Sequence, residues 1–496
     1  MRLARIVAAS SFIASTAAAQ TQAARGADAD TTYAPSRCGA PPSPASMDAI
    51  DRATLEWMRR SRTPAASIAV VRRGHDVITR TYGWADLVNC TRATPEMRFG
   101  IGSISKQMTA LAVLVLVQQG KLSLDDPIAR WFPESGDRWR GILVRHLLTH
   151  TSGIRDYAHD DPVYPQTEVD RKQLVTDSAH IARFAASPLN FSPGEAWAYS
   201  NTGYLLLSIL VQRVGGMSFP AWMRAHVFEP LGMRATRFYE AREIIPQLAR
   251  GYTIDRSGVL LQGAYDSDSF SHWGDSGVIS TAHDMALWAA ELDSSRLVSA
   301  ALHGLMLSPV RLRDGSVFPY GFGVLVDDYR GERVTTHSGT YYTGYSANFV
   351  AMPERGLSVV VLTNQHQGDP WIFTGTLLTL ADSTMRQISA MRSERDPAPD
   401  RTRRLAAFLN GDSLATQTSD AWRRIEWPRI RVFVSDLLPI GTEYITCDDV
   451  ARRRIERSDA TAARECYYRL SHGPMSMAIS VFYASDGRIV GMFPRP

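Results

Sequence analysis

Residues 99–117 read FGIGSISKQMTALAVLVLV. Residues 108–117 are too apolar for a surface helix and too few to span a membrane, which predicts a buried central helix. Ser103 and Lys106 stand at its beginning, and residues three apart on a helix project from the same face. The Lys106 amine can therefore approach the Ser103 hydroxyl, which needs such a base to act as a nucleophile at neutral pH.

Lysine is rare in this chain. Only Lys106, Lys121 and Lys172 occur among its 54 basic residues, and the others are arginines. Arginine cannot lose its proton in a protein, whereas the ordinary lysine pKa of about 10.4 falls when the amine is desolvated. A lysine retained beside Ser103 thus indicates an amine that changes its protonation state, while Lys121 and Lys172 are interpreted as surface lysines.

A second motif, Tyr199-Ser200-Asn201, lies between residues 191–195 (FSPGE) and a helix expected to start near Thr202. A tyrosine held near Ser103 and Lys106 can pass a proton between a nucleophile and a leaving group. The Asn201 amide can orient the lysine and bind a substrate carbonyl. Taken alone, the triplet is weak evidence, because Tyr and Asn before a helix are usually a packing residue and a helix N-cap.

A third motif, His337-Ser338-Gly339, follows a strand expected over residues 333–336. Glycine permits close approach of a ligand, and the N–H of Thr340 together with that of Ser103 can form an oxyanion hole. The triplet His366-Gln367-Gly368 also follows an expected strand. Spacing alone does not choose between the two triplets.

The chain of 496 residues predicts more than one domain. Residues 1–19 have the basic, apolar and small-residue order of a signal peptide, which predicts export to the periplasm or beyond. No later apolar run is long enough to predict a transmembrane anchor. The expected sequence of parts is a flexible segment over 20–46, a hydrolase-like domain over 47–390, a linker over 391–404 and a small α+β domain over 405–496.

The main domain is expected to have strands near both of its ends and helices between them. Helical periodicity interrupted by Pro and Gly covers about residues 122–307 and predicts a helical lobe. This order predicts an α/β (α+β) fold with one sheet built from both ends of the domain. Expected strands cover residues 66–73, 76–83, 321–327, 333–336, 346–352 and 357–363.

The four cysteines form an even set in a chain that is expected to be exported, so disulfides are predicted. Proximity in the sequence favours Cys38 with Cys90 and Cys447 with Cys466, although three pairings are possible. Their spacing is not that of a metal site, and no cofactor is expected. The net charge is only +4, the basic residues are interleaved with acidic ones, and no nucleic-acid-binding motif is present. The sequence therefore does not favour nucleic-acid binding.

The motifs S-x-x-K, Y-x-N and H-x-G follow one another in this chain. Together and in this order they resemble the motifs of the serine β-lactamase and penicillin-binding protein superfamily. The sequence is most similar to class C β-lactamases and to the D-aminopeptidases, DD-carboxypeptidases and esterases related to them. The resemblance covers about residues 47–385. Supporting stretches are residues 99–111, 146–153, 191–204, 230–233 and 274–277.

The resemblance implies an antiparallel sheet flanked by helices, with Ser103 as nucleophile and Lys106 and Tyr199 as the proton-transfer pair. It also implies substrate contacts from Asn201 and from the strand edge carrying His337, Ser338, Gly339 and Thr340, and a structural role for the stretch around His146 and His150. It favours His337 over His366. Where β-lactamases carry the lysine of K-T-G this chain has His337, and a mostly neutral imidazole weakens recognition of a carboxylate.

The expected function is acyl transfer from a small peptide, ester or β-lactam substrate through a serine acyl-enzyme. The H-x-G triplet favours an aminopeptidase or esterase over a β-lactamase. Two alternatives stay open: a sensor of penicillin or cell-wall peptides with little turnover, and a true β-lactamase.

Overall fold

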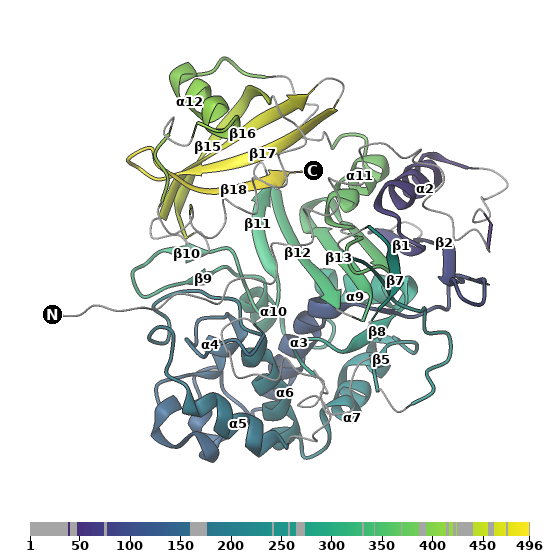
Figure 1. Cartoon of the computed structure of the whole chain (residues 1–496). Helices are drawn as coiled ribbons and strands as arrows, with labels where there is room; N and C mark the ends of the chain where they lie inside the picture. Colours follow the sequence, from purple (N-terminus) through teal and green to yellow (C-terminus); the bar gives the residue numbers. More distant parts are fainter. Residues whose placement is uncertain are drawn as a thin grey trace.

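The computed structural model describes most of the chain from residue 47 onward (Figure 1). The predicted signal peptide and most of the segment over 20–46 lie outside the described residues. These are 38–39, 47–73, 77–158, 176–240, 243–255, 258–263, 273–329, 332–341, 343–368, 370–385, 393–412, 416–419, 423, 440–454, 461–472 and 475–495.

A seven-stranded antiparallel sheet is the centre of the main domain, in the order β11-β12-β13-β14-β1-β2-β3. It joins strands from both ends of the domain, as the sequence predicts. β13 and β14 are buried along their whole length because their β-branched and apolar side chains are covered on both faces. The strands are β1 Ala65–Arg72, β2 Ile78–Asp86, β3 Thr91–Arg92, β11 Leu325–Tyr329, β12 Glu332–Tyr341, β13 Tyr345–Met352 and β14 Leu357–Thr363.

β12 is longer than the expected strand over 333–336. The triplet His337-Ser338-Gly339 therefore lies inside the strand and not after its end. Pairing with β13 continues from Thr335 to Tyr341, so the strand does not end before the triplet. On its other side β12 pairs with β11 only as far as Thr336, so residues 337–341 extend beyond that ladder.

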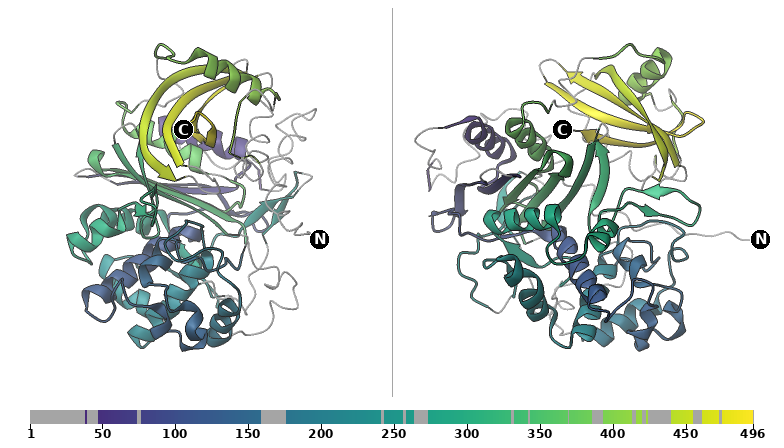
Figure 2. Two further views of the ribbon diagram at one scale, coloured as in Figure 1. Left: turned by 90° about the vertical axis from the view of Figure 1, so that its left-hand side faces the viewer. Right: turned by 180° about the vertical axis from the view of Figure 1, so that it is seen from behind.

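Helices cover both faces of the sheet. α2 (Ala49–Ser61) and α11 (Pro370–Ala381) pack on one face, with Met58 and Phe373 in the same apolar cluster. α9 (Ala282–Ser294) packs on the other face with the helical lobe (Figure 2). The Asp48 side chain caps α2 by accepting from the N–H groups of Ile50 and Asp51.

The helical lobe surrounds α3 (Ser105–Gln118), which is buried continuously from Ser105 to Leu116. This confirms the central helix predicted from residues 108–117. Among the described residues no single helix is long and apolar enough to cross a bilayer, and one pair, Asn201–Gly215 with Phe219–Leu231, passes only together across a 75° bend. The other helices here are α4 Val144–Leu148, α5 Asp177–Ala186, α6 Asn201–Gly215, α7 Phe219–Met223, α8 Glu229–Leu231 and α10 Ala300–Met306.

Short elements connect the lobe to the sheet. Two small sheets have the orders β4-β8-β5 and β6-β7. The strands are β4 Phe99–Gly100, β5 Arg237–Phe238, β6 Tyr252–Ile254, β7 Leu260–Gln262 and β8 Val278–Ser280, and the short helical turns are η1 Gly102–Ile104, η2 Ile128–Arg130, η3 Pro133–Trp139, η5 Arg224–Phe228 and η6 Pro353–Arg355.

The C-terminal unit has its own apolar core under a curved antiparallel sheet (Figure 2). Its first helix, α12 (Pro399–Leu409), begins inside the segment predicted as a linker, because Leu405 and Phe408 anchor it in that core. A tight turn at Asp486-Gly487 joins β17 and β18. The strands are β15 Gly441–Arg454, β16 Thr461–His472, β17 Met475–Tyr483 and β18 Ile489–Arg495.

The C-terminal sheet continues into the main domain. A hairpin of the main domain, β9 (Val310–Arg311) and β10 (Val317–Phe318), extends this sheet next to β15. Phe318 also stacks on Trp197, with ring centroids 3.8 Å apart. The two units therefore share a sheet close to the segment that carries Tyr199.

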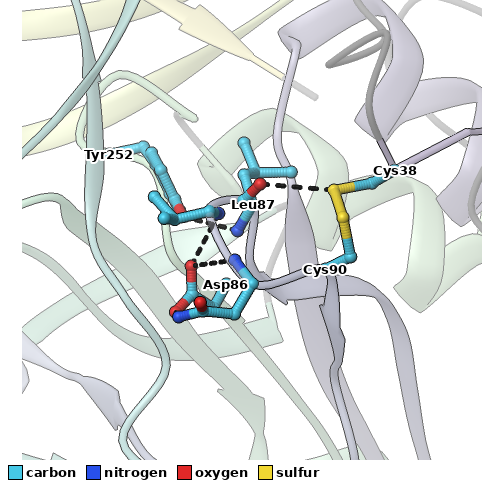
Figure 3. Close-up of a disulfide and its surroundings, with 7 residues drawn as sticks. Cys38, Asp86, Leu87, Cys90 and Tyr252 are labelled. Carbon is cyan, nitrogen blue, oxygen red and sulfur yellow. Dashed lines mark hydrogen bonds between the residues drawn. A yellow bond between two sulfur atoms is a disulfide. The ribbon is translucent and has the colours of Figure 1, made fainter.

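Both favoured disulfides are present, Cys38–Cys90 and Cys447–Cys466. Figure 3 shows the first beside the turn after β2, where the Cys38 sulfur lies 3.2 Å from the Leu87 carbonyl oxygen. The Leu87 N–H donates to the Tyr252 hydroxyl at 2.7 Å. The bridge thus attaches residue 38 to a turn that is itself bonded to β6.

Removing the two bridges is expected to destabilise two different cores. Loop entropy for separations of 52 and 19 residues corresponds to about 4 kcal/mol for Cys38–Cys90 and about 3 kcal/mol for Cys447–Cys466. Double Cys→Ser variants should lower the free energy of unfolding by these amounts in the main domain and the C-terminal core respectively. Denaturant-dependent hydrogen exchange measures the stability of the two cores separately. If removing one bridge lowered the stability of both cores equally, the assignment of each bridge to one core would be wrong.

Candidate active site

The structure brings Ser103 and Lys106 together at the junction of η1 and α3. The Lys106 Nζ lies 3.1 Å from the Ser103 Oγ, and the lysine side chain is fully buried. Nζ also donates to the Asn201 Oδ1 at 2.8 Å and to the Asp275 carbonyl at 2.7 Å. Because both of these are acceptors only, they hold two N–H groups, and the remaining position of Nζ faces Ser103.

This remaining position decides the chemistry. It carries an N–H when the lysine is an ammonium and a lone pair when the lysine is a neutral amine. In the neutral form the Ser103 O–H can donate to Nζ. Burial lowers the pKa of Lys106 to about 8, against the opposing charges of Asp275 and Asp156. The amine is therefore a usable base near neutral pH.

Asp156 sets the orientation of Asn201. Its carboxylate accepts from the Asn201 backbone N–H at 2.8 Å and from the Asn201 side-chain amide at 3.3 Å. With the amide nitrogen turned to Asp156, the Oδ1 faces Lys106. Asn201 is the first residue of α6, which Ser200 caps by accepting from the Gly203 N–H. Sequence reasoning missed Asp156, which lies 45 residues from Asn201 in the chain.

Asp275 lies on the other side of Lys106. Its Oδ2 accepts from the Tyr157 hydroxyl at 2.7 Å, and burial raises its pKa to about 6. The stretch 274–277 was singled out in the sequence, but no role was assigned to Asp275. Its contact with Lys106 spans 169 residues, so no local pattern indicates it.

Tyr199 covers the lysine with its ring. The ring centroid lies 4.8 Å from Lys106 Nζ and 4.5 Å from the centroid of the His150 ring. The ring face favours the charged form of the amine. The structure therefore brings all three predicted members, Ser103, Lys106 and Tyr199, into one cluster.

β12 contacts η1 through two glycines. A Cβ on Gly339 would lie 1.9 Å from the Ile101 carbonyl and 3.0 Å from the Ser103 nitrogen, and a Cβ on Gly102 would lie 2.6 Å from the Thr340 nitrogen. Only glycine at both positions permits this approach. The backbone segments that carry the Ser103 and Thr340 nitrogens thus approach closely, which is compatible with two N–H donors to one oxyanion.

The His337 side chain points inward. It is 5% exposed, its Nε2 lies 3.1 Å from the Tyr320 hydroxyl, and its Nδ1 lies 2.6 Å from the Ser338 carbonyl. Burial and the charge of Lys106 lower its pKa to about 4. At this edge of β12 the Ser338 and Thr340 side chains are exposed, whereas the His337 imidazole is buried.

The other histidines of interest have separate roles. His366, from the competing triplet, follows β14 and lines a cavity of about 340 Å³ with Ser338, Thr340 and Trp371. His146 accepts from the Leu143 N–H at 3.1 Å. Two aromatic residues lie nearby in the structure: Tyr157 contacts Asp275, and Trp273 packs against the main core.

The chain is similar to known proteins over most of its main domain. Residues 50–381 match the family described as Beta-lactamase. The chain is 30% identical over 308 residues to penicillin-binding protein 4* of Bacillus subtilis (strain 168), covering 59% of this chain and 67% of that protein. It is 28% identical over 337 residues to the D-aminopeptidase of Brucella ovis, covering 64% of this chain and 60% of that enzyme.

A solved structure extends the likeness of fold beyond the main domain. The octameric penicillin-binding protein homologue from Pyrococcus abyssi superposes with a TM-score of 0.58 at 24% identity, covering 89% of this chain and 95% of that chain. With the family match over residues 50–381 and the residues assembled around Ser103, the chain belongs to the β-lactamase family of serine hydrolases and related penicillin-binding proteins.

Proposed function

We propose that this protein hydrolyses amides of small D-amino acid derivatives through an acyl-enzyme on Ser103. The observation that carries the proposal is the buried Lys106 Nζ, 3.1 Å from the Ser103 Oγ, with one coordination position directed at that hydroxyl. The amide preference is supported by the similarity to a D-aminopeptidase. Export is part of the proposal and is supported by the two disulfides.

In the acylation step, the Ser103 hydroxyl proton moves to Lys106 Nζ while Oγ bonds to the substrate carbonyl carbon. The backbone N–H groups of Ser103 and Thr340 receive the resulting oxyanion. The leaving nitrogen takes a proton from the Lys106–Tyr199 pair as its bond to carbon breaks. Water then attacks the ester carbon and gives a proton to the pair, and Ser103 Oγ takes that proton as its bond to carbon breaks and the acid leaves.

Because His337 is neutral, we expect the site to favour substrates that have no charged group beside the scissile bond. A lysine in this position gives a permanent cation for a substrate carboxylate, whereas the buried imidazole gives none near neutral pH. Amides and esters that lack a free carboxylate there are therefore favoured over β-lactams and D-Ala-D-Ala peptides.

The test is turnover against a matched panel of D- and L-amino acid amides, D-Ala-D-Ala peptides, p-nitrophenyl esters and nitrocefin. We expect many equivalents of product per enzyme from D-amino acid amides and slower release from the L-amides. One stoichiometric burst without further release would instead support the sensor, and preferential turnover of nitrocefin would support the β-lactamase.

The pH profile is expected to follow Lys106. Only the neutral amine accepts the Ser103 proton, so kcat/KM should rise roughly tenfold per pH unit below a midpoint of about 8 and level off above it. Asp275, with a pKa of about 6, is ionised over this rising range. Initial rates on a p-nitrophenyl ester, corrected for spontaneous hydrolysis, give the profile. A flat profile, or a midpoint at the ordinary lysine value of about 10.4, would contradict this assignment.

A further inference from the structure

A buried chain of hydrogen bonds runs alongside Lys106 and joins three side chains. The Ser200 N–H donates to His150 Nδ1 at 3.1 Å, and His150 Nε2 lies 3.1 Å from the Tyr320 hydroxyl. That hydroxyl lies 3.1 Å from His337 Nε2, and His337 Nδ1 lies 2.6 Å from the Ser338 carbonyl. All three side chains are at most 5% exposed.

Two backbone groups settle the direction of the protons in this chain, the Ser200 N–H at one end and the Ser338 carbonyl, which can only accept, at the other. Because the Ser200 N–H can only donate, His150 Nδ1 accepts, and in the neutral ring Nε2 carries the proton. Nε2–H then donates to the Tyr320 oxygen, and the Tyr320 O–H donates to His337 Nε2. His337 therefore carries its proton on Nδ1 and donates it to the Ser338 carbonyl. Burial lowers the pKa of both imidazoles, consistent with two neutral rings.

The two ends of the hydrogen-bond chain lie on two different segments of the site. One end is the amide between Tyr199 and Asn201, and the other is the carbonyl between His337 and Gly339 on the part of β12 beyond the β11 ladder. The backbone carbonyl of His150 also accepts from the Ala198 N–H at 3.0 Å, so His150 makes two hydrogen bonds to the segment before Asn201. Its φ of 58° lies in the left-handed region, which is uncommon for residues other than glycine.

We propose that the chain His150–Tyr320–His337 is a brace that fixes the spacing between the Tyr199-Ser200-Asn201 segment and the substrate edge of β12. Tyr320 is its central positioning residue, and the brace requires an uncharged hydrogen-bond acceptor at position 337. Its effect on catalysis rests on the hydrolysis proposed above, whereas its proton arrangement does not.

Further groups face the brace, among them the Tyr204 hydroxyl, which contacts the Tyr320 hydroxyl. Lys106 contributes its positive charge and the ring of Tyr199 lies against His150. The Tyr204 hydroxyl donates to the Leu148 carbonyl at 2.6 Å. The two acidic residues near Lys106 already have partners: Asp156 is hydrogen-bonded to Asn201, and Asp275 is hydrogen-bonded to Tyr157. A charged side chain at position 337 would therefore add a second cation near Lys106. Among these contacts it would have no acidic partner.

The first test is Tyr320→Phe, which removes both central bonds and leaves the ring. We expect kcat to fall about 10- to 100-fold with KM changed less than about threefold, because misplacement of a reacting group by about 1 Å costs about that much. The matched control is Tyr82→Phe, which removes another buried hydroxyl bond, to Asp51, in the cluster on the far face of the sheet. Equal activity in the two variants would overturn the brace.

The second test compares two replacements of His337. Glutamine supplies an uncharged acceptor for the Tyr320 O–H and should retain activity within about tenfold. Lysine, although it is the residue of the K-T-G motif, supplies only donors and a second buried cation. His337→Lys should therefore lose more than about 100-fold in kcat and gain no nitrocefin hydrolysis. Wild-type activity in the lysine variant would overturn the requirement for an acceptor.

The closing test needs no turnover. Nitrogen-15 NMR of histidine-labelled protein, with the His337 signals assigned by their loss in His337→Gln, should show Nδ1 protonated and Nε2 unprotonated throughout about pH 5 to 8. Tyr320→Phe should shift the Nε2 signal, while Tyr82→Phe should leave it unchanged. The opposite tautomer, or titration within this range, would overturn the brace even if the enzyme is active. The expected spectrum in an inactive protein would leave the brace standing and count against the proposed hydrolysis alone.

Discussion

Replacing Ser103 by alanine should reduce kcat by on the order of 10⁴- to 10⁶-fold, the range seen when a catalytic serine is removed from a serine hydrolase. Ser103 is only partly buried on η1, and its Oγ lies 3.1 Å from Lys106 Nζ. Alanine keeps the backbone N–H of residue 103 for the oxyanion and removes only the nucleophile. The fold should therefore persist while acylation stops.

The measurement is covalent labelling by a serine-reactive phosphonate, followed by intact mass. The wild type should take up one equivalent and Ser103→Ala none. Ser294→Ala, at the exposed end of α9, is the matched control and should label like the wild type. Labelling of Ser103→Ala at unchanged stoichiometry would place the nucleophile elsewhere and remove the basis of the proposed mechanism.

Local patterns predicted those parts of the site that depend on local geometry. Ser103 and Lys106 are three residues apart across the junction of η1 and α3, so their contact follows from helical spacing. The apolar run after Lys106 predicted burial of the lysine, and burial is the cause of its lowered pKa. Proximity in the sequence also predicted both disulfides.

The parts that were missed depend on contacts between distant segments. Asp156, Asp275 and Tyr320 each reach the site across 17 to 170 residues, and nothing in their neighbours distinguishes them from ordinary polar residues. The strand expected over residues 333–336 is in fact longer, because β12 continues to Tyr341. Pairing with β13 and close packing on Gly102 outweigh the low strand propensity of glycine there.

Lys106→Arg tests the inference drawn from the scarcity of lysine. Arginine keeps the positive charge and can donate to the Asn201 Oδ1 and the Asp275 carbonyl, but it cannot become neutral in a protein. Without a base, the Ser103 proton has no acceptor. The acylation rate should fall by about 10²- to 10⁴-fold, the contribution of general base catalysis.

Two further variants separate proton transfer from packing. Lys121 is exposed, so Lys121→Arg should acylate like the wild type. Because Lys106 is fully buried, the larger guanidinium is expected to cost about 1–3 kcal/mol of stability by overpacking. Lys106→Met avoids that cost, since it has a similar length and no charge, and it should be as slow as Lys106→Arg.

Single-turnover acylation by a p-nitrophenyl ester, measured as a function of pH, gives the sharpest readout. The wild type should show the rise centred near the Lys106 pKa of about 8, and both Lys106 variants should lose that rise along with the rate. If Lys106→Arg kept the rate within about tenfold of the wild type, the lysine would act only as a fixed charge. Tyr199, whose ring lies 4.8 Å from Nζ, would then be the remaining candidate for the base.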